Sequence, residues 1–239
     1  MKNILKLSIV LFTTISYAQT ISGEQLLNNA IKYHDPNNNW QSFNGSLDVI
    51  MKMPKSKPRI SEITINLPKE YFKVIAKRDT IISTYIMEKG NCIISKNDSI
   101  RIANLKEKPK RTHCEMTALY KDYYTYLYGL PMKLKDEGTN LAETVEKKTF
   151  KGKTYLVLKV TYDEAVGSDV WYFYFNPKTY AMEIYQFFKT DENGKMKKDS
   201  GEYILLTEEV EINDIKFPKN RAWYYNKNDG YLATDYLSN

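Results

Sequence analysis

The amino-acid sequence predicts an α+β fold, in which one largely antiparallel sheet carries two helices. Three observations lead to this prediction. Apolar and polar residues alternate with a period of two along many short segments. Turn residues separate these segments at a spacing of roughly 8 to 12 residues. Two longer segments repeat their apolar residues with a helical period. Strands that follow one another through short turns pair as hairpins, so we expect an antiparallel sheet.

The alternation is clearest in the first half of the chain. From position 43 to 53 the apolar side consists of Phe43, Gly45, Leu47, Val49, Met51 and Met53. Pro54 and Pro58 end this strand, and Ile63, Ile65 and Leu67 repeat the pattern in the next one, until Pro68. Further strands are expected at 71–77, 81–87 and 92–95, with turns at 89–91 and 96–98. The first half is therefore predicted to be a meander.

Two helices interrupt the strands, the first over 23–33 and the second over 113–128. Both begin with a capping box, formed by Ser22 with Gln25 and by Thr112 with Glu115. Apolar residues then recur at helical spacing, and in the second helix many of them are tyrosines. Asp35-Pro36 and Gly129 end the two helices.

Strands resume after the second helix. They are expected at 144–150, 155–162, 170–175, 180–189, 203–212, 217–225 and 231–237. In the strand at 170–175, Trp171, Phe173 and Phe175 alternate with Val170, Tyr172 and Tyr174, so both faces are apolar or amphipathic. Such a strand either is covered on both faces or lines a cavity. The chain has 20 tyrosines, 9 phenylalanines and 3 tryptophans. Tyrosine suits the wall of a partly hydrated cavity as well as a core, because its ring is apolar and its hydroxyl group is polar.

Residues 1–18 have the three-part pattern of a secretory signal peptide. Lys2 and Lys6 precede an apolar run, and Ser16-Tyr17-Ala18 places small residues at the cleavage site. The run is shorter than the roughly 20 residues of a spanning helix. We therefore expect export to the periplasm or the medium, cleavage after Ala18, and a mature chain of residues 19–239.

Composition narrows the classes of partner. Removing residues 1–18 takes away two lysines, so the formal net charge falls from +6 to +4, and the basic residues are spread along the chain. A nucleic-acid partner is therefore not expected. In an oxidising compartment Cys92 and Cys114 either form a disulfide, which would contribute about 3 kcal/mol, or remain as two buried thiols.

The sequence has no local motif for catalysis, a metal or a cofactor. His34 and His113 are the two histidines, and neither lies at a metal-ligand spacing. Carboxylate groups occur at 163–169, 191–192 and 208–211, where turns and outward-facing strand positions account for them. We therefore predict no catalytic residues, no metal ligands, no cofactor and no enzymatic activity.

Several segments resemble the lipoprotein-localisation carrier superfamily (LolA/LolB-like). The shared features are a signal peptide, a short helix, a Phe-x-Gly-x-Leu strand at 43–47, an Asn-Pro-Lys-Thr turn after the aromatic strand, and an Ile-x-Phe-Pro segment at 215–218. More closely, segments 123–138 (YYTYLYGLPMKLKDEG) and 167–172 (GSDVWY) are similar to an uncharacterised family of secreted bacterial proteins that is grouped with these carriers. The resemblance implies a single LolA-like domain over 19–239. It also implies a curved antiparallel half-barrel whose concave face is covered by two or three helices and holds acyl chains.

The leading hypothesis is a periplasmic or secreted binding or carrier protein for a lipid, a lipoprotein or another amphiphile. The alternating strands would form the concave wall, and the second helix would form a lid. The predicted ligand-binding residues are Phe43, Leu47, Val49, Met51, Ile63, Ile65, Tyr123, Leu127, Trp171 and Phe173. We expect a monomer that makes peripheral contact with envelope membranes.

The sequence leaves two alternatives open. The first is a glycan- or surface-contacting module of the envelope, in which Trp40, Trp223 and the C-terminal tyrosines form an exposed stacking platform. The second is a hydrolase that is assembled from distant acidic residues, which requires at least two facing carboxyl groups with shifted pKa values in a cleft.

Overall fold

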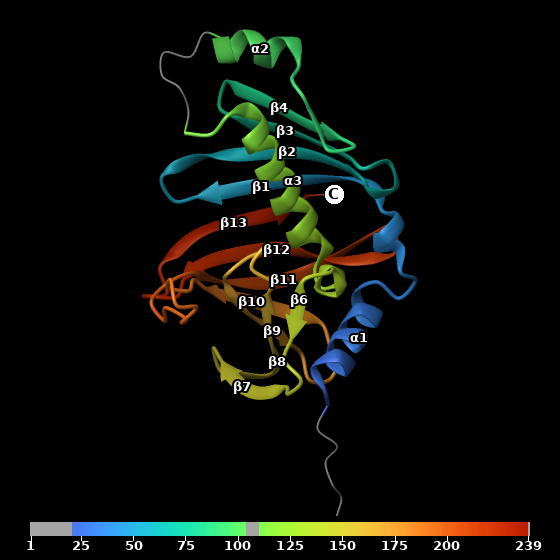
Figure 1. Ribbon diagram of the computed structural model, residues 1–239, viewed down its shortest axis with the longest axis vertical. Coiled ribbons are helices and arrows are strands. Elements are labelled where there is room, and N and C mark those ends of the chain that lie inside the picture. Colours follow the sequence, from blue (N-terminus) through green and yellow to red (C-terminus); the bar gives the residue numbers. More distant parts are fainter. Residues whose placement is uncertain (1–20, 104–109, 239) are drawn as a thin grey trace, which may run out of the picture.

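The computed structural model describes residues 21–103 and 110–238, so the predicted signal peptide and its cleavage site at Ala18 lie outside the described residues. Within these ranges one sheet of thirteen strands is formed, and all its pairings are antiparallel (Figure 1). The strands are β1 (Asn44–Met53), β2 (Ser56–Asn66), β3 (Tyr71–Arg78), β4 (Ile81–Glu88), β5 (Asn91–Ile93), β6 (Thr139–Leu141), β7 (Glu146–Phe150), β8 (Lys153–Tyr162), β9 (Val170–Phe175), β10 (Met182–Phe188), β11 (Glu202–Ile212), β12 (Ile215–Tyr225) and β13 (Tyr231–Leu237).

The sheet consists of two meanders that meet in its middle. Its order is β5-β4-β3-β2-β1-β13-β12-β11-β10-β9-β8-β6, with β7 paired to β8. The first and last strands of the chain, β1 and β13, join the meanders, with Val49 opposite Leu237 and Met51 opposite Asp235. The ends of the order, β5 and β6, do not pair with each other, so the sheet is open. The predicted α+β half-barrel is confirmed.

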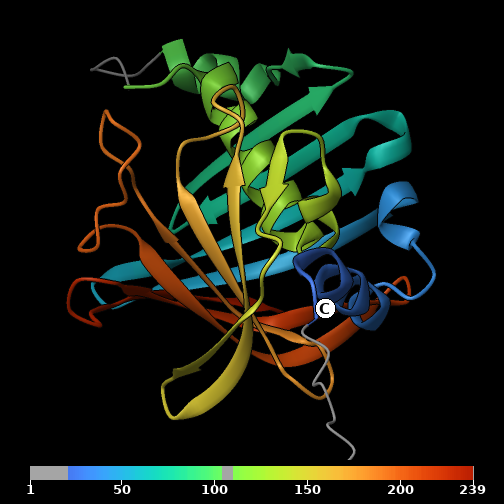
Figure 2. The same ribbon diagram turned by 60° about the horizontal axis from the view of Figure 1, so that its bottom comes forward.

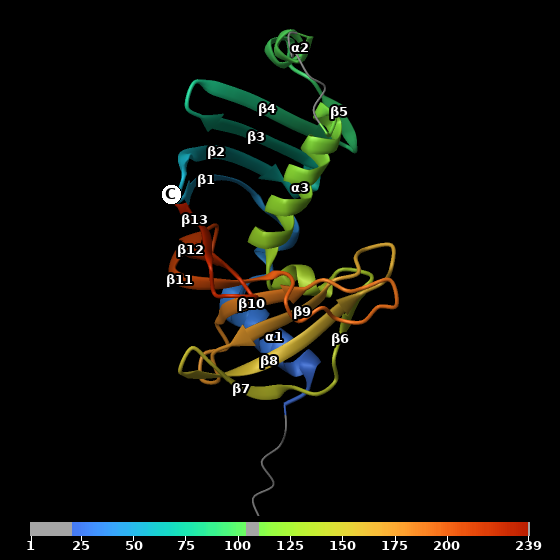
Figure 3. The ribbon, with the colours of Figure 1, turned by 90° about the vertical axis from the view of Figure 1, so that its left-hand side faces the viewer.

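The sheet is twisted and bends around its helices. Figure 2 shows the yellow and orange strands of the second meander running in a different direction from the blue strands of the first. Figure 3 shows the bend from the side, with α3 (His113–Gly129) lying across the concave face. The other helices are α1 (Gly23–His34), α2 (Lys96–Ala103), η1 (Asn39–Ser42), η2 (Leu67–Lys69) and η3 (Met132–Lys135).

Both predicted helices are present, and both predicted capping boxes are formed. The side chain of Ser22 accepts from the Gln25 amide, and that of Thr112 accepts from the Glu115 amide. The segment at 96–98 is predicted as a turn, but this prediction is wrong because the segment begins helix α2. The physical reason is a local cap, because Ser95 Oγ accepts a hydrogen bond from the Asp98 amide at 3.1 Å and so favours a helix over a simple turn.

A disulfide joins α3 to the sheet edge. Cys92 on β5 and Cys114 in the first turn of α3 are bonded, with their Cα atoms 5.6 Å apart. In the same region Tyr85 of β4 stacks on His113, with ring centroids 4.8 Å apart. The N-terminal end of α3 is thus held against β4 and β5, and its C-terminal end extends toward β12 and η3 (Figure 1).

The main core lies between α1, α3 and the concave face, and a smaller cluster lies on the opposite face of the second meander. That smaller cluster consists of Tyr155, Val157, Tyr174 and Ile184, with Phe150 of β7 packed against it. Because Phe173 and Phe175 belong to the main core, β9 is covered on both faces along most of its length.

Candidate ligand groove

A groove of about 880 Å³ lies beside the C-terminal half of α3. Its walls come from α3, η3, β6, β8, β9, β10, β12 and the loop before β9. The lining residues are Leu119, Lys121, Asp122, Tyr123, Thr125, Tyr126, Leu127, Lys133, Asp136, Glu137, Thr139, Tyr162, Val166, Gly167, Ser168, Asp169, Trp171, Phe187 and Trp223. Its volume is in the range of about 300 to 1,000 Å³ that is typical of small-molecule sites.

The groove is lined by packed aromatic rings. Trp171 on β9 stacks on its cross-strand partner Phe187 on β10, with ring centroids 4.9 Å apart. Tyr126 of α3 meets Trp171 edge to face at 5.7 Å, and its hydroxyl is hydrogen-bonded to that of Tyr162. These rings come from a helix and three strands, and their apolar faces give the groove a surface suited to hydrocarbon.

Charged side chains line the rim of the groove. Lys121 pairs with Asp122 at 3.5 Å, and Lys133 pairs with Asp136. Burial raises the pKa of Asp169, which Lys189 partly opposes. The groove therefore combines aromatic rings with charged side chains.

Behind the groove, four side chains form a row across the concave face. Arg59, Met51, Asp235 and Arg221 are successive cross-strand partners on β2, β1, β13 and β12. We call them the concave row. Asp235 and Arg221 are 2% and 1% exposed, so charge is buried under α3.

The concave row is hydrogen-bonded to α3. Tyr123 Oη donates to Asp235 Oδ2 at 3.2 Å, Arg59 Nη2 donates to Tyr124 Oη at 3.2 Å, and Arg221 Nη2 donates to the Leu127 carbonyl at 3.4 Å. Burial raises the pKa of Asp235, and the positive charges of Arg59 and Arg221 oppose the rise. The underside of α3 is thus attached to the sheet by polar contacts as well as by packing.

The structure places the ten predicted ligand-binding residues in three settings. Tyr123, Leu127 and Trp171 line the groove. Met51 belongs to the concave row and packs against the core. Buried core positions, at most 1% exposed, are occupied by Phe43, Leu47, Val49, Ile63, Ile65 and Phe173. These six positions are therefore filled by packed core side chains, and the open space lies beside the C-terminal half of α3.

Tyr126, Phe187 and Asp169 line the groove but are not among the ten ligand-binding residues predicted from the sequence. Tyr126 lies three residues after Tyr123, so helical spacing alone would have placed it beside the predicted lining. The position of Phe187 depends on its register opposite Trp171, which the alternation does not specify.

The predicted exposed aromatic platform is wrong. Trp40 is 5% exposed and Trp223 is 9% exposed. Trp40 packs against Phe43 and against Gly129, where an added Cβ atom would lie 2.5 Å from the indole ring. Trp223 lies against Tyr123, with ring centroids 6.2 Å apart, and donates its indole N–H to Asp235. Both rings are buried because helix α3 and its C-terminal end cover them.

The histidines and the acidic residues with shifted pKa values do not form a catalytic or metal site in the described residues. His34 Nε2 accepts the Met182 amide at 2.9 Å, so Nδ1 is the atom that donates to the Lys216 carbonyl, also at 2.9 Å. No group of three or more metal-ligating side chains gathers in the described residues. Burial also raises the pKa values of Glu202 and Asp235, but neither lines the groove beside Asp169. The hydrolase hypothesis gains no support from these three carboxyl groups.

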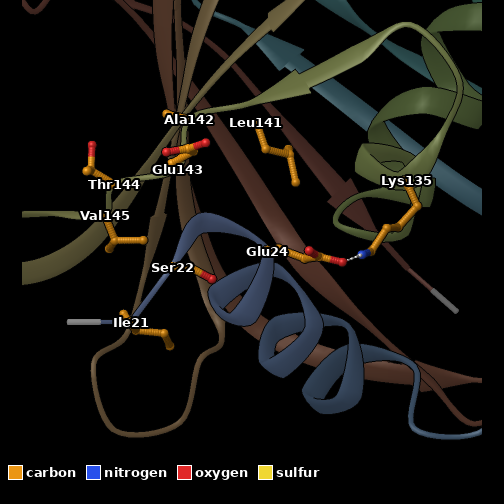
Figure 4. A pocket seen from close by; sticks show the side chains of 9 residues that line it. All are labelled: Ile21, Ser22, Glu24, Lys135, Leu141, Ala142, Glu143, Thr144 and Val145. Carbon is orange, nitrogen blue, oxygen red and sulfur yellow. Dashed lines mark ion pairs between the residues drawn. The ribbon is translucent and has the colours of Figure 1, made fainter. Parts of the chain in front are cut away.

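A second hollow, of about 700 Å³, lies at the start of α1 (Figure 4). Its lining has no aromatic ring, and the ion pair between Glu24 and Lys135, at 3.6 Å, runs along its edge. The backbone of Gly23 donates to the Glu143 carbonyl at 2.9 Å and ties the helix to the loop before β7. This hollow is lined by four aliphatic side chains but lacks the aromatic rings of the groove.

The chain matches one family model over residues 2–238, that of a family of unknown function (DUF6503). It belongs to this DUF6503 family. No curated protein matches this DUF6503 chain. Two solved structures share the fold of the DUF6503 chain over nearly its whole length. A LolA superfamily protein from Nitrosomonas europaea has a TM-score of 0.54 at 10% identity, with 92% of each chain covered.

The second structure is a DUF1329 family protein from Desulfovibrio piger, with a TM-score of 0.50 at 8% identity and 91% of each chain covered. At these identities the likeness concerns the fold. It confirms the predicted resemblance of this DUF6503 chain to the LolA-like superfamily. Among the described residues, no helix has both the length and the apolar character needed to cross a bilayer.

Proposed function

We propose that this protein binds or carries an amphiphile, such as a lipid or the acylated end of a lipoprotein, in the groove beside α3. One observation carries the proposal. The two segments that resemble the uncharacterised secreted family, 123–138 and 167–172, lie far apart in the sequence but meet at the groove, where they supply eleven of its nineteen lining residues. Both segments that carry this resemblance therefore lie at the open aromatic site.

The chemistry of the groove suits a hydrocarbon tail. Each methylene group that leaves water for an apolar surface gains about 0.8 kcal/mol. Trp171, Phe187 and Leu127 provide apolar surface, while Tyr126 and Tyr162 add rings whose hydroxyl groups are already hydrogen-bonded to each other. When a tail lies against these two rings, both of their hydroxyl groups therefore keep a hydrogen-bond partner.

The proposal extends to the biology of the chain. Residues 1–18 would direct export and be cleaved after Ala18, and residues 19–239 would form the single binding domain, in the periplasm or outside the cell. The domain would act as a monomer and would exchange its ligand through peripheral contact with envelope membranes. The solved LolA superfamily structure supports this only through the shared fold.

The proposal is tested with N-phenyl-1-naphthylamine, a neutral dye that fluoresces in apolar sites. We expect the purified protein to take up the dye, and acylated compounds to displace it. Trp171→Ala removes the central ring of the groove and should weaken dye binding by at least about tenfold. Tyr225→Ala removes a ring that is 43% exposed and lies outside the groove, so it should leave binding unchanged.

Thermal unfolding of both variants separates lost binding from lost folding. If neither the dye nor any of several acyl and lipopeptide probes binds to the folded protein, the proposal is wrong. Equal losses of binding in Trp171→Ala and Tyr225→Ala would also contradict it, because they would place the bound dye elsewhere.

A further inference from the structure

The charges that line the groove do not balance. Its two lysines, Lys121 and Lys133, are each paired with an aspartate that also lines the groove. Two further carboxylates line it, Glu137 and Asp169, and across the described part of the chain neither has an ion pair within 4.0 Å. The groove is therefore acidic, although the whole chain has a formal net charge of +6.

Of these two carboxylates, Asp169 is the one that lies close in sequence to an aromatic ring of the groove. It directly precedes β9 and stands two residues before Trp171, and both side chains line the groove. Asp169 is only partly exposed, and no hydrogen bond within the described residues holds its carboxyl group. Lys189 acts on Asp169 from a distance and acts on Glu202 as well, so it does not neutralise Asp169 alone.

A partly desolvated carboxylate beside aromatic faces is suited to a cation. An ammonium group placed over the face of a tryptophan or tyrosine is attracted by the ring quadrupole, and this attraction increases as water is excluded. Burial already raises the pKa of Asp169, so a positive charge nearby would favour its ionised form. Trp171 and Tyr126 are two such rings that line the groove, and they meet edge to face with their centroids 5.7 Å apart.

We propose that the groove selects amphiphiles with a cationic head, an amine or a quaternary ammonium group on an alkyl chain. The head lies between the Asp169 carboxylate and the rings of Trp171 and Tyr126, and the tail runs against Leu127 and Trp223. This inference rests on the proposed function, because it names the class of ligand for the same groove.

The test compares three detergents with the same dodecyl tail and different heads, all below their micelle-forming concentrations. They are dodecyltrimethylammonium, dodecyl sulfate and dodecyl maltoside, titrated into the purified protein by calorimetry. We expect the cationic detergent to bind at least about tenfold more tightly than the other two, and added salt to reduce this preference.

A variant of Asp169 tests whether this residue causes the preference for a cationic head. Asp169→Asn should weaken binding of the cationic detergent by about tenfold and leave that of dodecyl maltoside unchanged. Glu164→Gln makes the matched exchange at an exposed position of the same loop that does not line the groove, and should change neither. The head preference of the unaltered protein is a readout that does not depend on the folding of any variant.

The outcomes separate the two proposals. If no detergent binds, the proposed function itself fails. If dodecyl sulfate or dodecyl maltoside binds as tightly as the cationic detergent, the amphiphile site stands and the cationic head is refuted. An unchanged preference in Asp169→Asn would also refute the assigned position of the head.

Discussion

Arg221 illustrates how single residues keep the space under α3 polar. Its guanidinium group lies over the ring of Tyr128, with the central carbon 3.8 Å from the ring centroid, and donates to the carbonyls of Pro218 and Leu127. Asp235, the cross-strand neighbour, supplies a negative charge without a direct ion pair. A buried charge with so few partners is costly, and hydrophobic side chains of the same volume would often serve stability as well. The buried charges of the concave row are therefore weak evidence for a gain in stability.

His34 leads to the first prediction, which concerns pH. Burial lowers its pKa, and Lys216 and Arg221 add to the lowering, whereas its backbone hydrogen bond and Glu209 oppose it. The unfolded chain then binds more protons than the folded chain at pH values between the lowered pKa and the ordinary histidine pKa of 6.5. Stability should therefore be fully present above that pH and should fall as the pH drops through the lowered pKa. Urea unfolding at several pH values between about 4.5 and 8 measures this slope.

The variant His34→Gln isolates this contribution. It should lower stability at neutral pH, because it disturbs the hydrogen bonds to Met182 and Lys216, and it should flatten the pH slope. His113, whose pKa burial also lowers, leaves a residual slope, which His113→Asn should reduce in turn. A slope that is identical in His34→Gln and the unaltered protein would show that His34 is not buried in its neutral form.

At the scale of elements, α3 is attached differently at its two ends. Its N-terminal end is bonded covalently through Cys114 to Cys92 on β5. Its C-terminal half is held by the concave row and lines the groove. The covalent attachment is thus remote from the groove, and its loss should affect folding more than binding.

The second prediction follows from this separation. The double variant Cys92→Ser, Cys114→Ser should be about 3 kcal/mol less stable than the unaltered protein, because the bond closes a loop with a sequence separation of 22. Dye binding to the folded variant should change by less than about twofold. Unfolding in urea and dye titration at a low temperature measure the two quantities. A loss of binding without a loss of stability would mean that the disulfide positions the groove.

The sequence was sufficient for elements that depend on local patterns. The strand period and the capping boxes at Ser22 and Thr112 each depend on a few neighbouring residues, and the structure has them. Pro58 was predicted to end a strand, but it lies inside β2, which begins at Ser56. Helix α2 was missed because it is eight residues long and its cap at Ser95 was masked by turn-forming residues. Strand β6 was missed because its three residues acquire strand geometry only by pairing with β8.

At the scale of the whole molecule, the sequence did not determine where the concave face is open. Strand alternation identifies which side chains point toward the concave face. Whether the space above them is filled depends on the size of the α3 side chains that pack there. Large rings such as Tyr120 and Tyr124 fill the part over β3 and β4. Small side chains, at Thr125, Gly167 and Ser168, line the part that remains open. These residues come together only in the folded chain.

The third prediction tests whether that open space is the site of binding. Thr125 lies on the face of α3 that lines the groove, and its hydroxyl donates only to the Lys121 carbonyl of its own helix. Thr125→Trp should place an indole ring in the groove and weaken binding of dye and amphiphiles by at least about tenfold. Because the ring would enter space that is already open, stability should change by less than about 1 kcal/mol.

Thr154→Trp is the matched control, since it makes the same exchange at an exposed position of β8 that does not line the groove. It should leave binding intact. If Thr125→Trp binds the dye as tightly as the control does, then the ligand lies elsewhere on the concave face, and the groove is not the binding site. If Thr125→Trp instead unfolds at a much lower urea concentration, the groove is a packed part of the core that the added ring has forced apart, and the same conclusion follows.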